Sequence, residues 1–239
     1  MKNYDEDIEI QIDKLFKKVG NKDIKENYKE DLTEIFSIIY AINYIKNKAE
    51  TSRYFKTDYF KITYSCLLES YSLILHNYPK AAALVLRSSL ENFIKHIIYT
   101  INYEYETDYN INDRSYSVNK TTLEKIIDNE FKEDFKQNGK EINGKLERIY
   151  KNLSGLSHSL TQESKSNTLD YFFDLDEINK DNIELVIVKY IEVSYLLFSL
   201  SIILCGPSLK LWDRNHLEML LRLVFGKRRS NTYIKKIKS

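Results

Sequence analysis

The chain has 239 residues, enough for one domain with a sizeable core, and its 43% hydrophobic and 30% charged residues are typical of a soluble globular protein. It contains six glycines and two prolines. No loop of the GxGxxG or GxxxxGKS type occurs, which argues against the nucleotide-binding α/β folds. Long runs at helical spacing therefore predict an all-α protein, one up-and-down bundle with additional helices at both ends.

Cysteines, metal-ligand patterns and apolar runs give expectations about compartment and cofactors. Cys66 and Cys205 lie in apolar runs, which suits buried thiols in a reducing cytoplasm. No CxxC or HExxH pattern occurs, so we expect neither a metal nor another cofactor. The first ten residues are charged, and the most apolar window, Val193 to Cys205, is 13 residues long. We therefore expect no signal peptide, no membrane contact and a cytoplasmic protein.

The first part of the chain predicts three helices before a proline break. A short helix over Asp5–Lys18 ends at Gly20, and a long helix covers Ile24–Lys48. A third helix over Asp58–His76 is broken by Tyr78-Pro79, which opens the next helix because proline is tolerated in a first turn. The long helix carries one apolar stripe, formed by Ile35, Ile38, Ile39, Ile42 and Ile45.

The helix that starts at Pro79, PKAAALVLRSSLENFIKHIIY, has a clear apolar seam made by Leu86, Leu90, Phe93 and Ile97. Arg87 and Glu91 lie four residues apart on a neighbouring face, where a structural ion pair is expected. In a bundle this pair would brace the helix that carries a functional site.

The stretch between this helix and residue 144 predicts a loop and a shorter helix. Residues 102–120 are polar and rich in tyrosine and asparagine, which is typical of a loop or a lid. The segment Thr121 to Glu124 has the capping-box spacing and predicts a helix start. That helix is expected to run to about Phe135 and to end at the break Gln137-Asn138-Gly139.

The rest of the chain predicts three more helices and a basic tail. One helix runs from about Gly144 into KNLSGLSHS, Lys151 to Ser159. A long helix over Asp181–Cys205 is stopped by Gly206-Pro207, and a last helix covers Ser208–Phe225. One helical domain is thus expected over residues 1–225, followed by a tail over 226–239.

The tail holds six cations and no acidic residue from Lys227 onward. Two interpretations are open. Lys227, Arg228 and Arg229 are candidate contacts to RNA phosphates, or the segment is a frayed, solvated terminus.

The segment Lys151 to Ser159 combines the residue types that RNA cleavage without a metal requires. His158 is a candidate acid or base because imidazole titrates near neutral pH. Lys151 is a candidate cation for the charge that grows on the phosphate, and Asn152 is a candidate orienting group. Arg148 and Ser157 are candidate phosphate contacts. The alternative is a histidine near a helix C-terminus that interacts with the helix dipole.

The pair LRSSLENFIKHIIY and YKNLSGLSHS resembles the HEPN superfamily, most closely bacterial HEPN-like proteins of phage-defence and toxin systems. The resemblance covers roughly residues 79–159. It implies a helical bundle that dimerises, with an arginine, a polar residue and a histidine that form a composite, metal-independent ribonuclease site. The matching positions here are Lys151, Asn152 and His158, so a lysine stands where the family has arginine.

From this resemblance we expect a ribonuclease or toxin-type effector of anti-phage defence, of the abortive-infection kind. Its partners would be RNA, a second copy of the chain, and an antitoxin or a larger defence protein. The alternative is a catalytically degenerate HEPN-like subunit that binds a partner protein or RNA. A third interpretation is an RNA-binding module driven by the tail from Lys227.

The remaining three histidines predict structural positions. His76 and His96 lie on apolar helices and are expected in the core or at its boundary. His216, in DRNHLEML, is expected as an exposed helix residue.

Overall fold

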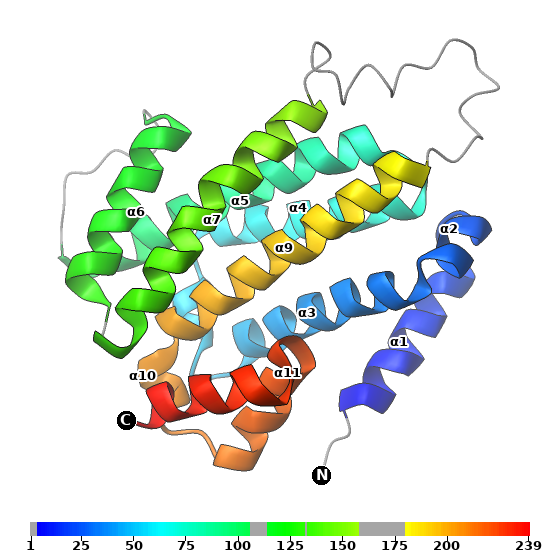
Figure 1. The fold of residues 1–239 in the computed structure, drawn as a ribbon. Coiled ribbons are helices and arrows are strands. Elements are labelled where there is room, and N and C mark those ends of the chain that lie inside the picture. The colour runs from blue at the N-terminus through cyan, green and yellow to red at the C-terminus, as the bar shows by residue number, and fades with distance from the viewer. Residues whose placement is uncertain (1–3, 106–113, 132, 158–179) are drawn as a thin grey trace.

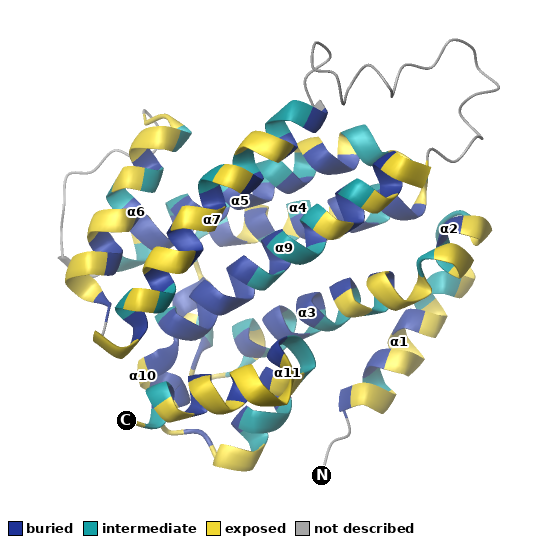
Figure 2. Ribbon diagram, viewed as in Figure 1, coloured by how far each residue is buried: buried dark blue, intermediate teal, exposed yellow. Residues whose placement is uncertain are grey.

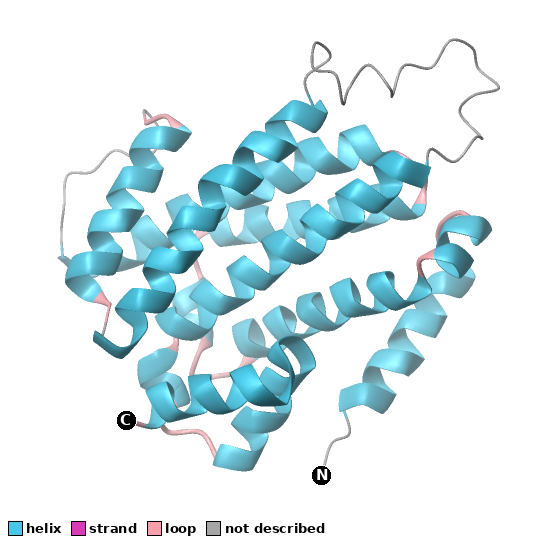
Figure 3. Ribbon diagram, viewed as in Figure 1, coloured by secondary structure: helices cyan, strands magenta, loops and turns pink. Residues whose placement is uncertain are grey.

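The computed structural model describes residues 4–105, 114–131, 133–157 and 180–239, and in these ranges it contains helices and no strand (Figure 3). The all-α prediction is confirmed. Figure 1 labels the α-helices of the described ranges. In chain order the elements are α1 (Tyr4–Lys18), α2 (Lys22–Asn27), α3 (Lys29–Asn47), the 3₁₀ helix η1 (Ser52–Phe55), α4 (Asp58–Leu75), α5 (Pro79–Tyr105), α6 (Tyr116–Glu130), α7 (Glu133–Ser157), α9 (Lys180–Leu204), α10 (Gly206–Leu209) and α11 (Arg214–Lys238).

Helix α9 is the centre of the bundle and packs against α3, α4, α5 and α7 (Figure 1). The fully buried Tyr190 donates its hydroxyl to the carbonyl of Leu67 at 2.5 Å, which satisfies a polar group deep in the core. Among the described residues, α9 is the one helix long and apolar enough to cross a membrane, but 72% of its most apolar stretch is buried inside the fold. Figure 2 shows this burial along α9, as in the core helix of a soluble protein.

Helices α4 and α5 form an antiparallel hairpin, as the break at Tyr78-Pro79 predicts. Asn77 makes the turn with φ of 65°, a left-handed conformation that asparagine tolerates. Its amide donates to the carbonyl of Ile74 at 3.0 Å, and the amide of Tyr78 donates to Leu73 at 2.9 Å. These bonds end α4 and aim α5 back along it.

The helix predicted over Ile24–Lys48 is two helices, because Tyr28 leaves helical geometry with φ of −121° and ψ of 26°. Asn21 caps α2 by accepting from the amides of Asp23 and Ile24. The predicted apolar stripe is confirmed as part of the core, with all five isoleucines of α3 buried.

The start of α6 differs from the capping-box prediction. Ser115 is the N-cap and accepts from the amide of Val118 at 3.4 Å, so the helix begins one and a half turns before Thr121. Thr121 lies inside α6 and donates to the carbonyl of Ser117 at 3.1 Å. The loop predicted over residues 102–120 is also wrong at both ends, because α5 runs to Tyr105 and α6 begins at Tyr116. Residues 106–113 lie outside the described ranges.

The break predicted at Gln137 to Gly139 is wrong as well, because α7 runs through it without interruption. A Cβ on Gly139 would lie 2.5 Å from Cγ2 of Ile127 and 3.2 Å from the ring of Phe131. The glycine is therefore required by the close approach of α7 to α6. The contact partner is distant in sequence, so the sequence pattern does not reveal it.

The last helix differs from its predicted bounds of Ser208–Phe225 at both ends. Asp213 caps α11 by accepting from the amides of Asn215 and His216 at 3.0 Å each. The chain turns at Gly226, with φ of 65° and ψ of 174°, and continues as helix to Lys238. The basic segment is consequently folded, and the interpretation as a frayed terminus is wrong. Its apolar face joins the core through the buried residues Tyr233, Ile234 and Ile237.

His216 is not an exposed helix residue, contrary to its prediction. Its Nε2 lies 2.6 Å from the hydroxyl of Tyr44 and 2.7 Å from that of Tyr4, and its ring stacks on Trp212. Burial, together with the charge of Lys48, lowers the pKa of His216. The histidine thus joins α11 to α1 and α3, which the sequence pattern of α11 alone did not reveal.

His96 and His76 were both predicted in the core or at its boundary, which is confirmed for His96 and wrong for His76. His96 is fully buried, and its Nδ1 bonds with the hydroxyls of Thr57 at 2.8 Å and Thr100 at 3.2 Å. Burial lowers the pKa of His96 to about 3, so the ring is neutral in the fold. His76 is exposed at the end of α4, where the helix has already left the core.

The two cysteines, both predicted to be buried, differ in their burial. Cys205 is buried as predicted, whereas Cys66 is only half-buried.

Candidate functional site

The C-terminal half of α7 carries the residues that the sequence predicts as a site. The helix is described up to Ser157, and His158 lies outside the described residues, as does Ser159. The backbone of Ser157 belongs to α7, but its side chain is outside the description. Arg148, Lys151 and Asn152 are exposed on α7.

Lys151 is bound to an acidic neighbour. Its Nζ lies 2.8 Å from Oε1 of Glu147, and Nζ of Lys120 on α6 lies 2.8 Å from Oε2 of the same carboxylate. The hydrogen bonds from Lys120 and Lys151, with their charges, lower the pKa of Glu147 to about 2. The carboxylate stays ionised at neutral pH and is shared by two ammonium groups, so these three side chains together carry one net positive charge.

Asn152 projects from a different face of α7 than Lys151, since adjacent helical residues point about 100° apart. Its neighbours along the helix are Lys145 and Arg148, at spacings of seven and four residues, which place the three side chains on one face. Lys145 lines a hollow between α7, α9 and α11. The structure thus separates the predicted cation from the predicted orienting group.

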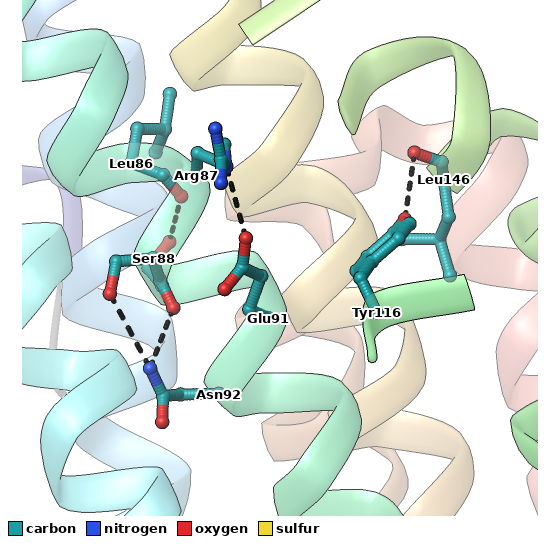
Figure 4. A network of polar contacts seen from close by, with 8 residues as sticks. Leu86, Arg87, Ser88, Glu91, Asn92, Tyr116 and Leu146 are labelled. Carbon is teal, nitrogen blue, oxygen red and sulfur yellow. Dashed lines mark hydrogen bonds and ion pairs between the residues drawn. The ribbon is translucent and has the colours of Figure 1, made fainter. Parts of the chain in front are cut away.

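A second cluster, which we call the Arg87 cluster, consists of Arg87, Glu91, Tyr116 and Tyr150. Figure 4 shows Arg87 and Glu91 on α5, with Nε of Arg87 donating to Oε1 of Glu91 at 3.0 Å. The predicted ion pair is confirmed. The guanidinium carbon of Arg87 lies 5.1 Å from the ring centre of Tyr150 on α7, within the range of a cation–π contact.

The two tyrosines of the Arg87 cluster connect α6 to α7. Their rings stack with centres 3.6 Å apart and planes inclined by 6°. Tyr116 donates its hydroxyl to the carbonyl of Leu146 at 3.2 Å (Figure 4). The Tyr150 ring contacts both Tyr116 and the Arg87 guanidinium, so α5, α6 and α7 meet at one aromatic side chain.

The electrostatics of the Arg87 cluster keep its arginine charged and its tyrosine neutral. Burial lowers the pKa of Arg87, but the hydrogen bond to Glu91 and the contact with Tyr150 outweigh this, so the net shift is upward. Burial and the charge of Glu91 raise the pKa of Tyr150, while Arg87 and a hydrogen bond with Ser154 act in the opposite direction. The cluster therefore presents a fixed cation beside two hydroxyl groups at neutral pH.

Sequence reasoning missed Tyr116, Tyr150, Lys120 and Glu147. Tyr150 precedes Lys151 directly, and its spacing of four residues to Ser154 and eight to His158 is a helical-face signal that was available in the sequence. Tyr116 and Lys120 come from another helix, so no local pattern could have indicated their contacts.

The predicted phosphate contacts of the basic segment separate into two groups. Lys227 and Arg228 are exposed on the solvent side of α11. Arg229 lines the hollow that also holds Lys145, and its Nη1 donates to the hydroxyl of Tyr195 on α9 at 2.7 Å. A further cavity of about 300 Å³ carries Arg53, Lys236 and Glu130 over an otherwise largely apolar lining.

Within the described ranges, no three His, Cys, Asp or Glu side chains lie close enough together to hold a metal ion. Comparisons with protein-family models, with curated proteins and with solved structures gave no match. The functional interpretation therefore depends on the geometry and on the sequence motif.

Proposed function

We propose that the protein is a HEPN-like endoribonuclease that cleaves RNA without a metal, as a toxin-type effector of bacterial anti-phage defence. His158 is the general acid or base, and the bundle works as a homodimer in the cytoplasm. The observation that carries this proposal is the place of Arg87, whose guanidinium lies 5.1 Å from the ring of Tyr150 on the helix that leads into His158.

Arg87 supplies the chemical group that the motif of α7 lacks. A guanidinium binds phosphate through a planar pair of N–H donors, whereas the ammonium of Lys151 is a point charge. Each cation has a carboxylate neighbour, Glu91 for Arg87 and Glu147 for Lys151, so the planar fork is what distinguishes them. Nε of Arg87 donates to Glu91, and the guanidinium also hydrogen-bonds with Tyr150. A guanidinium has five N–H donors, so these two bonds leave donors for a phosphate oxygen. Its side chain is 23% exposed, which allows contact with a ligand while the Tyr150 ring holds it in place.

The fixed position of Arg87 supports a role in stabilising the transition state. Charge develops on the phosphate oxygens during cleavage, and a cation that is already oriented needs no reorganisation at that moment. The hydroxyl of Ser154 lies beside Tyr150, and His158 follows Ser154 by four residues in the sequence. A guanidinium on α5 and the hydroxyls of Tyr150 and Ser154 on α7 thus lie together, just before His158 in the sequence.

The decisive experiment measures cleavage of single-stranded RNA in the presence of EDTA. His158→Ala is expected to lower the rate by about 100-fold to 10,000-fold, the usual contribution of a general acid or base. Arg87→Gln is expected to lower it by about 100-fold or more, with Arg87→Lys intermediate because it keeps the charge but loses the planar fork.

The matched control is His76→Ala, which removes an exposed histidine from the end of α4 and should leave cleavage unchanged. Thermal melting of each variant checks that the fold is retained. A His158→Ala protein that cleaves RNA, or kills cells on expression, as wild type does would refute the enzymatic proposal.

The second candidate function is a catalytically degenerate HEPN-like subunit that binds RNA or a partner protein. The ion pair between Lys151 and Glu147 favours it, because the cation at the motif position is paired with a carboxylate. In this case wild type does not cleave RNA, and Lys151→Arg combined with Glu147→Gln restores an arginine without its acidic neighbour. Cleavage that appears only in the double variant would identify a degenerate site.

A further inference from the structure

The hollow between α7, α9 and α11 has a volume of about 190 Å³ and is separate from the Arg87 cluster. Its lining is mixed, with the aliphatic side chains of Ile142 and Leu196 beneath a polar rim. The rim carries the polar groups Asn138 and Thr232 and the cations Lys145 and Arg229, while Ser199 is buried in the lining. We call this hollow the α7–α11 groove.

Arg229 is held in the α7–α11 groove by an aromatic side chain. Its Nη1 donates to the hydroxyl of Tyr195 at 2.7 Å, and its guanidinium carbon lies 5.6 Å from the centre of the same ring. The contact fixes one end of an otherwise flexible side chain, so less conformational freedom is lost when an anion binds. The neighbouring Arg228 has no place in the groove lining and points to solvent.

The charge of the groove favours an anion. Among the described lining residues, Lys145 and Arg229 are the cations and Glu141 is the one carboxylate. Oε1 of Glu141 accepts from Nε2 of Gln137 at 3.0 Å, on the exposed side of α7. The remaining polar groups of the lining are an amide and hydroxyls, which complement phosphate and ribose oxygens.

Polar side chains extend beyond the groove along the same side of α7. Arg148 and Asn152 follow Lys145 at three and seven residues, on the same side of the helix and exposed. From Lys145 to the end of α7 at Ser157 the helix rises by about 18 Å. A polar track thus leads from the groove along α7 toward the end of this helix.

We propose that the α7–α11 groove binds the sugar-phosphate backbone of single-stranded RNA, with Lys145 and Arg229 on its phosphates. The proposal rests on the function proposed above, because it describes where the substrate of that site is held. A backbone contact is independent of base identity, so the groove adds affinity without sequence preference. A peptide or a lipid surface fits less well, because the exposed rim is polar and concave rather than apolar.

The experiment uses full-length protein with His158→Ala, so that bound RNA stays intact, and measures fluorescence anisotropy of a labelled single-stranded RNA between roughly 50 and 200 mM salt. Lys145→Gln with Arg229→Gln is expected to weaken binding about tenfold per cation and to reduce the slope of log K against log salt by about 1.4, at about 0.7 per phosphate.

The control double variant is Lys140→Gln with Arg214→Gln, which removes the same charge from exposed positions on the same two helices, outside the groove lining. It should bind within about threefold of the parent, as expected of long-range effects alone. Arg229→Lys provides a conservative variant that keeps the charge, and it should retain the salt slope. Equal losses in the groove and control double variants would overturn the proposal.

Failure of the groove is distinguishable from failure of the ribonuclease. If wild type cleaves RNA and the groove double variant binds RNA as tightly as the control, the groove proposal is wrong and the enzyme remains. If wild type never cleaves but the groove variant loses binding and salt slope, the groove stands and the catalytic proposal is wrong.

Discussion

Replacing Gly139 by alanine tests whether this glycine is present for helix packing. An alanine normally stabilises a helix interior by about 1 kcal/mol relative to glycine. At Gly139, however, the new Cβ would lie 2.5 Å from Cγ2 of Ile127 and 3.2 Å from the ring of Phe131. Overpacking of this kind costs about 1–3 kcal/mol, so the net change in the free energy of unfolding ranges from about zero to a loss of about 2 kcal/mol.

Gly144 gives a matched control on the same helix. A Cβ there meets no atom within 4 Å, and the position is exposed, so Gly144→Ala should stabilise the protein by about 1 kcal/mol. The two variants differ only by the packing cost, which is therefore the difference between their free energies of unfolding, about 1–3 kcal/mol.

The assay is urea unfolding followed by circular dichroism, with melting as a second measure. In a domain of this size, 1 kcal/mol corresponds to about 2–4 °C in the melting temperature. We expect Gly144→Ala to melt above wild type and Gly139→Ala at least 2 °C below the Gly144 variant. If both alanines stabilise the protein equally, α6 and α7 do not approach at Gly139 as described.

The remaining predictions concern titration and backbone geometry. The pKa of His96 is lowered to about 3 in the fold, so the unfolded chain binds a proton more strongly at this histidine. The contribution of His96 to the free energy of unfolding should be constant above about pH 6.5. Below that pH it should decrease by about 1.4 kcal/mol per pH unit toward pH 3. A His96→Leu protein should show a smaller decrease between these pH values in urea titrations. The pKa of Glu147 is lowered to about 2, so its contribution is present above the unfolded pKa of about 4.3 and is lost as the pH falls toward 2. Glu147→Gln should therefore reduce the loss of stability between about pH 4.3 and pH 2, and it should leave the pH dependence of stability near pH 6 unchanged. Gly226 has φ of 65° and ψ of 174°, a region nearly restricted to glycine. Gly226→Ala should therefore destabilise the protein by about 1–3 kcal/mol in urea unfolding. An unchanged midpoint of the urea transition would show that the turn relaxes without strain.

Local patterns in the sequence predicted the elements whose causes are local. The isoleucine stripe of α3, the turn before Pro79 and the pair of Arg87 with Glu91 all depend on residues within one or two helical turns. The break wrongly predicted at Gly139 has the opposite origin. A glycine there is compatible with a turn or with a close helix contact, and only Ile127 on another helix decides between them.

The same distinction applies to the candidate site. The chemistry of Lys151 was readable from its type, but its partner Glu147 was overlooked although it lies four residues away on the same helix. The contacts of Tyr150 with Arg87 and Tyr116 join three helices, and no spacing rule along one segment predicts them. The fold class was therefore accessible from sequence, whereas the grouping of side chains at the site required coordinates.

The bonds of His216 to Tyr4 and Tyr44 have a consequence for the order in which the chain matures on the ribosome. Tyr44 and His216 are 172 residues apart. At the usual synthesis rate of about 5–20 residues per second, roughly 10 to 35 s pass between the two. During that interval the nascent α1 and α3 lack the contacts that Trp212 and His216 make with Tyr4 and Tyr44, so these early helices remain accessible to chaperones until translation has nearly finished.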